Sequence, residues 1–62
     1  MNFTIRHYRN GRLAASDRAI TMYQARSAAQ HRQAELDSSA AVILGQRADG
    51  EEIEIEVLQF KH

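Results

Sequence analysis

The chain has 62 residues, no cysteine and a formal net charge of zero. A chain this short forms one domain, residues 1–62, and buries only about 60% of the surface that its unfolded form exposes, so self-association is an expected source of stability. The missing cysteines exclude disulfides and thiolate metal sites, and because His7, His31 and His62 are scattered along the chain, no metal or cofactor is expected.

The neutral total conceals two oppositely charged halves. Residues 1–33 carry six arginines against the single acid Asp17, a net charge of +5. Residues 34–62 carry seven acids against one arginine and one lysine, a net charge of −5. Such asymmetry is typical of interaction proteins and of folds that pair their own halves. No apolar run is long enough to span a bilayer and no signal segment begins the chain, so a cytoplasmic location is expected.

The first predicted element is a β-hairpin. Asn10-Gly11 is a dipeptide that type I′ turns prefer, because both central residues of that turn need a positive φ. It joins an extended stretch over residues 3–8 to a weaker one over residues 13–20. The pairing that follows places Phe3 and Ile5 on one face of the sheet and Tyr8 opposite Leu13 on the other.

A helix is predicted next, over residues 22–36. This segment is alanine-rich and contains no glycine or proline. Thr21 and Gln24 match a capping box, in which each side chain satisfies a free backbone N–H group. At 100° per residue one face of the helix is apolar and would lie on the sheet; it consists of Met22, Ala25, Ala29 and Leu36.

Asp49-Gly50 predicts a second two-residue turn, between residues 40–44 and 52–57. The later stretch alternates acidic and apolar residues, which favours a half-buried strand. The whole chain therefore predicts an α+β fold of order ββαββ, in which two hairpins form one antiparallel sheet and a single helix packs on one face.

The second turn also predicts which residues face each other. A two-residue loop pairs Leu44 with Ile55 and Val42 with Val57, on the face under the helix, and pairs Arg47 with Glu52 on the open face. The open face then exposes an apolar patch rimmed by charges, which is typical of an interface; the patch consists of Tyr8, Leu13, Ile43, Leu58 and Phe60. In the alternative interpretation, a bulge or twist near Val57 turns Leu58 and Phe60 back into the core.

These patterns predict a non-enzymatic binding protein that uses the open face for a homodimer or a protein partner. The alternative is nucleic-acid or nucleoprotein binding through the arginine-rich first hairpin, where Arg6, Arg9 and Arg12 would reach phosphates and Tyr8 would stack on a base. A third hypothesis takes the acidic run as a phosphate-backbone mimic, whereas the same residues also serve as a solvated strand edge that resists aggregation; they include Glu52, Glu54 and Glu56. No catalytic motif is present, so neither an enzyme nor a small-molecule substrate is expected.

The ββαββ pattern with a short alanine-rich helix is similar in outline to many small bacterial and phage-encoded proteins, including some anti-CRISPR inhibitors. The resemblance is one of architecture, and it implies a small regulator or inhibitor.

Overall fold

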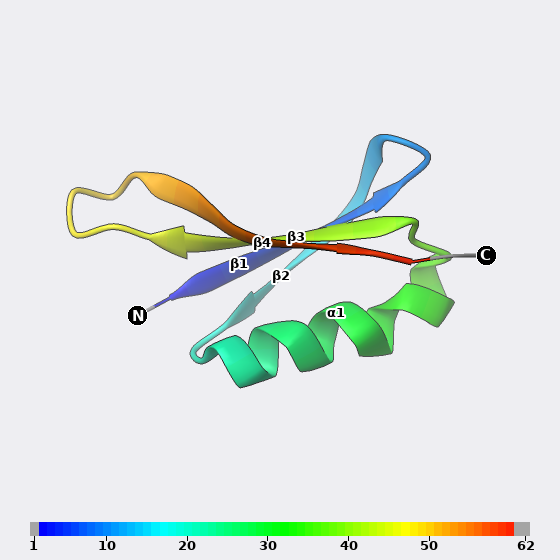
Figure 1. Cartoon of the computed structure of the whole chain (residues 1–62), viewed down its shortest axis with the longest axis horizontal. Helices are drawn as coiled ribbons and strands as arrows, with labels where there is room; N and C mark the ends of the chain where they lie inside the picture. Colours follow the sequence, from blue (N-terminus) through cyan, green and yellow to red (C-terminus); the bar gives the residue numbers. More distant parts are fainter. Residues whose placement is uncertain (1, 61–62) are drawn as a thin grey trace.

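A computed structural model describes residues 2–60 of the chain. Lys61 and His62, which enter the charge count and the set of histidines above, lie outside the described residues. The order ββαββ and the α+β class are confirmed (Figure 1). The elements are β1 (Phe3–Arg9), β2 (Arg12–Ala19), α1 (Met22–Leu36), β3 (Ala40–Gln46) and β4 (Glu52–Gln59).

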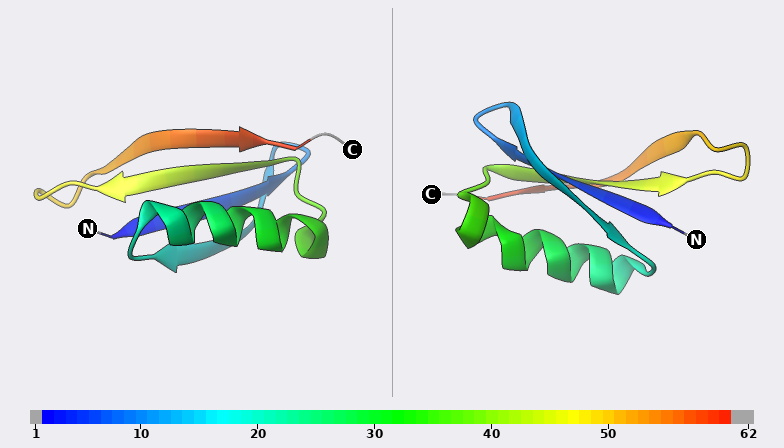
Figure 2. Two further views of the ribbon diagram at one scale, coloured as in Figure 1. Left: turned by 60° about the horizontal axis from the view of Figure 1, so that its bottom comes forward. Right: turned by 180° about the vertical axis from the view of Figure 1, so that it is seen from behind.

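The four strands form one antiparallel sheet in the order β2-β1-β3-β4. α1 lies on one face of this sheet and packs mainly on β1 and β2 (Figure 2). The hairpin of β3 and β4 extends beyond the first turn of the helix, so its tip is not covered (Figures 1 and 2). The opposite face of the sheet has no second layer within the described residues, and we call it the open face.

The first hairpin has the predicted turn. Asn10 and Gly11 both have positive φ values, 51° and 80°, and Arg9 pairs with Arg12 across the loop. The register shifts once between His7 and Tyr8, and Tyr8 then lies opposite Leu13 as predicted.

The helix begins and ends where the sequence predicts. The Thr21 hydroxyl accepts a hydrogen bond from the Gln24 N–H at 3.1 Å, and the Gln24 side-chain oxygen accepts one from the Ile20 N–H at 3.1 Å. The second bond satisfies the N–H group of Ile20, whereas in a capping box it would satisfy the N–H group of the N-cap residue, Thr21. Ala25 and Ala29 are fully buried, and their small side chains let the helix lie close to the sheet.

The second hairpin has a different turn from the predicted one. The Arg47 N–H donates to the Glu51 carbonyl at 2.7 Å, and the Gly50 N–H donates to the Arg47 carbonyl at 2.9 Å. Gly50 has a φ of 90°, so the loop is a three-residue turn that uses glycine in the left-handed region. The extra loop residue shifts the register by one, and the predicted pairs Arg47–Glu52 and Leu44–Ile55 are wrong.

Beside this turn Gln46 lies opposite Glu52 and Leu44 opposite Glu54, and a bulge then corrects the register. Ile55 is the extra residue of the bulge, and its side chain lies over Gly45, which has no side chain to displace it. Beyond the bulge Val42 lies opposite Val57, as predicted.

The pairing of β1 with β3 decides which residues of β3 face the helix. Phe3 lies opposite Gly45, Ile5 opposite Ile43 and His7 opposite Ala41. The predicted face for Val42 is therefore wrong, because the residues of β3 that share a face with buried Ile5 are the odd-numbered ones. The buried core cluster consists of Phe3, Ile5, Ala19, Ala25, Ala29, Ala41 and Ile43.

Candidate functional site on the open face of the sheet

Three of the five residues predicted for the open-face patch lie on the helix side. Ile43 is fully buried in the core, and Leu58 and Phe60 pack against that core. Their predicted placement is wrong, because Leu58 lies opposite buried Ala41 and cross-strand partners share a face. The alternative interpretation, in which a bulge near Val57 turns Leu58 and Phe60 into the core, matches the structure.

Tyr8 and Leu13 lie opposite each other on the open face, as predicted. The structure adds three apolar residues that the sequence interpretation had placed under the helix, namely Val42, Leu44 and Val57. Val42 is half-buried, Leu44 is buried, and Val57 and Leu13 are exposed. Together with Tyr8 these residues form what we call the apolar stripe of the open face.

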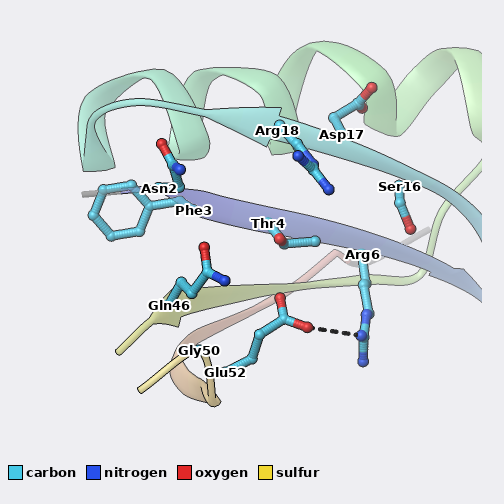
Figure 3. A pocket seen from close by; sticks show the side chains of 10 residues that line it. All are labelled: Asn2, Phe3, Thr4, Arg6, Ser16, Asp17, Arg18, Gln46, Gly50 and Glu52. Atoms are coloured by element: carbon cyan, nitrogen blue, oxygen red, sulfur yellow. Dashed lines mark hydrogen bonds and ion pairs between the residues drawn. The ribbon is translucent and has the colours of Figure 1, made fainter. Parts of the chain in front are cut away.

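A hollow of about 570 Å³ opens on this face beside the first residues of β1 (Figure 3). Polar groups line this hollow. They include the guanidinium groups of Arg6 and Arg18, the hydroxyl groups of Thr4 and Ser16, the amide of Gln46 and the carboxylate of Glu52. The Arg6 side chain points toward Glu52, and the two groups form an ion pair at 3.4 Å (Figure 3).

The charged halves of the sequence meet within one chain. Among residues 2–60, four ion pairs join an arginine of the first half to an acid of the second; they are Arg6–Glu52, Arg9–Asp37, Arg26–Glu56 and Arg32–Glu35. All four are at least partly exposed and therefore contribute little to stability individually. The internal pairs account for part of the opposed charge without any partner.

The ion pair of Arg26 with Glu56 has the best geometry. The guanidinium donates two hydrogen bonds to the carboxylate, at 2.9 and 3.0 Å. These hydrogen bonds lower the pKa of Glu56 below the usual range of a glutamate and raise that of Arg26. Through this pair the helix is linked to the edge strand β4.

The three arginines proposed to contact nucleic acid do not act as one free cluster. Arg6 is held by Glu52 and Arg9 lies 3.6 Å from Asp37, while Arg12 has no ion-pair partner among residues 2–60. The acids of the proposed mimic are divided as well, since Glu56 faces the helix and Glu54 lies on the open face.

A buried polar cluster that the sequence interpretation missed lies on the helix side. His7 is fully buried, and its Nε2 atom is 2.7 Å from the Asp17 carboxylate, which also lies 3.7 Å from Arg32. The signal was present in the sequence, because His7 continues the alternation of Phe3 and Ile5. The cluster connects β1, β2 and α1 beneath the helix, and its Asp17 also borders the hollow.

Among the described residues no group of three histidine, aspartate or glutamate side chains could hold a metal ion. In the same range, α1 is neither long nor apolar enough for a membrane-spanning helix. No protein-family model, curated protein or solved structure matches this chain. The function is therefore inferred from the residues themselves.

Proposed function

We propose that this chain is a non-enzymatic binding protein whose open sheet face docks on a protein surface. The observation that carries the proposal is the apolar stripe, which runs across a sheet face without a second layer among residues 2–60 and is rimmed by arginine and glutamate side chains. An apolar surface with a charged rim is typical of protein interfaces. A cytoplasmic regulator or inhibitor of bacterial or phage origin is the finer form of this proposal.

Docking through a sheet edge is less favoured than docking through the face. The edge strands are β2 and β4, and each pairs with its neighbour through a bulge. The β1–β2 pairing shifts register between His7 and Tyr8, and the β3–β4 pairing shifts between Ile43 and Leu44. β4 also carries three glutamates, and bulges and charges on edge strands discourage the addition of another strand.

Nucleic-acid binding through the first hairpin is the second candidate. Arg12 at the hairpin tip has no ion-pair partner among residues 2–60, and the hollow exposes Arg6 and Arg18. We place it second because Arg6 and Arg9 already have carboxylate neighbours. If no labelled duplex or single strand binds at low salt, this alternative is excluded, since phosphate contacts are strongest there.

Photo-crosslinking tests the proposal with a matched pair of positions. Val57 and Ile53 belong to the same strand and are 44% and 45% exposed, but Val57 lies on the open face and Ile53 pairs with Gly45 on the helix side. A photoreactive amino acid is placed at one position or the other, and covalent adducts are identified by mass. We expect protein adducts mainly from position 57. Adducts that form equally from both positions, or from position 53 alone, contradict the proposal.

A further inference from the structure

The strand register arranges the open face in rows that cross the sheet from β2 to β4. Directly paired residues in an antiparallel sheet share a face, so the pairs of the three strand ladders can be joined. The first row is Arg18, Thr4, Leu44 and Glu54; the second is Ser16, Arg6, Val42 and Val57; the third is Leu13, Tyr8, Ala40 and Gln59.

The first row begins with a cation and ends with an anion. Arg18 and Glu54 are both exposed, and neither has an ion-pair partner among residues 2–60. Three strand spacings separate them, roughly 14 Å, so they do not reach each other within one chain. The row therefore carries two unpaired opposite charges at its ends and uncharged residues between them.

We infer that the occupant of the open face is a second copy of this chain, related by a two-fold axis that runs parallel to the strands between β1 and β3. This inference rests on the proposed function and names its partner. Such an axis reverses the strand order, so that β2 of one copy lies over β4 of the other. Each row of one copy then lies over the same row of the other copy, with the order of its residues reversed. Arg18 of each copy therefore meets Glu54 of the other.

Two further facing pairs also fit this arrangement. In the third row Tyr8 faces Ala40 of the second copy, and in the first row Leu44 faces Thr4, so a larger side chain meets a smaller one in both cases. Packed sheets lie about 10 Å apart with strands crossing at about 30°, a separation that arginine and glutamate side chains bridge together.

Two other symmetric arrangements leave the two charges unmatched or bring like charges together. A two-fold axis across the strands keeps the strand order, so that β2 lies over β2 and β4 over β4, and Arg18 never meets Glu54. Pairing of two β4 edges side by side brings together strands that each contain three glutamates. Like charges directly opposite each other are destabilising, so the axis parallel to the strands is the one that the charge pattern selects.

The size of the face sets the expected strength of the dimer. Four strands about 4.8 Å apart and about seven residues of about 3.3 Å each give a footprint of roughly 19 by 23 Å. The product, roughly 440 Å² per partner, is about half of the roughly 800 Å² that each partner of a standard stable interface buries, and it corresponds to a weak, transient interface. We therefore expect a dimer that dissociates in the micromolar range.

Charge reversal tests the arrangement by sedimentation analysis over a concentration series. Arg18→Glu places two glutamates at each of two symmetric contacts, and Glu54→Arg places two arginines there. We expect each variant to raise the dissociation constant by about tenfold, since attraction is replaced by repulsion at two exposed contacts. Arg47→Glu, in the exposed loop of the second hairpin, is the control and should leave the dimer unchanged.

Mixing the two single variants gives the sharpest readout. In a mixed dimer the introduced glutamate of one variant meets the introduced arginine of the other at one contact, and the native Glu54 meets the native Arg18 at the second. Both contacts are again of opposite charge. We expect the mixture to associate within about threefold of the wild-type affinity, with mixed dimers exceeding both homodimers in native mass spectra. An equal weakening by the Arg47→Glu control, or a mixture no stronger than its components, overturns the inference.

These outcomes separate the inference from the proposed function. Crosslinks from position 57 to a different protein, with a wild-type chain that stays monomeric, leave the docking face in place and overturn the second copy as its occupant. If position 57 crosslinks to a second copy of this chain, and the charge-reversed variants crosslink as well as the wild type, the proposed two-fold axis is wrong. Equal crosslinking from positions 57 and 53 contradicts the docking face itself.

Discussion

The two faces of the sheet are built from the same four strands but are held by different interactions. On the helix side Ile5, His7 and Ile43 are fully buried, and a polar cluster is enclosed with them. On the open face Arg6 and Val42 are half-buried, and the exposed ion pair of Arg6 with Glu52 joins β1 to β4. Because burial contributes far more than an exposed ion pair, stability should depend on the helix side, while association should depend on the open face.

The largest effect should come from the centre of the helix side. Ile43→Ala removes most of a fully buried side chain and should lower the free energy of unfolding by about 2–5 kcal/mol, a large part of the stability of so small a domain. The measurement is denaturant unfolding followed by circular dichroism at low protein concentration.

Val42→Ala is the matched control for this change. Val42 is the next residue of β3 but is half-buried on the open face, so its truncation should cost clearly less. An equal loss in the two variants would show that the two faces contribute alike to stability.

The buried polar cluster should give the next largest effect. Asp17→Ala removes the acceptor of the His7 Nε2 atom, and the Nδ1 atom of the same ring has no partner within the described residues. Two ring nitrogens without partners in the core should cost about 1–3 kcal/mol. Denaturant unfolding measures the loss, and Glu51→Ala, an exposed change in the second hairpin loop, should cost much less. Comparable losses would assign no special role to the cluster.

The local signals in the sequence were sufficient for the elements. The Thr21 cap, the alanine-rich segment after it and the Asn10-Gly11 turn each depend on neighbouring residues only, and the structure contains all three. For the same reason the burial of Ala25 and Ala29 followed from helical periodicity alone.

The faces of the second hairpin depended on two features that the sequence did not reveal. One is the length of the turn. Asn10-Gly11 and Asp49-Gly50 look alike, but the Asp49 side chain accepts a hydrogen bond from the Glu51 N–H at 3.0 Å, and only Gly50 has a positive φ in that loop.

The other feature is the neighbour of β3 in the sheet. The side of Ile43 is decided by its pairing with Ile5 on β1, a contact between residues 38 positions apart. Because one residue of slip exchanges the two faces, the positions of Ile43, Leu58 and Phe60 could not follow from the hairpin alone. Tyr8 and Leu13 were placed correctly because both belong to the hairpin whose turn is read locally.

The smallest predicted effect is on stability in acid, and it comes from the ion pair of Arg26 with Glu56, which links the helix to β4. The hydrogen bonds from Arg26 lower the pKa of Glu56 in the folded chain below its ordinary value of 4.5. The unfolded chain therefore binds more protons between these two pKa values, so this contribution is present above the ordinary pKa and is lost as pH falls through the folded one. Glu56→Gln should lower the melting temperature slightly at neutral pH and flatten its decline in acid.

Melting curves of Glu56→Gln and the wild type from neutral pH to about pH 3 test this prediction across the range in which glutamates titrate. Glu51→Gln, whose carboxylate has no ion-pair partner among residues 2–60, is the matched control and should follow the wild-type profile. If Glu56→Gln and Glu51→Gln give parallel profiles, the bond between the helix and β4 makes no contribution in solution. The edge strand β4 would then be held by its pairing with β3 and by the packing of Leu58 against the core.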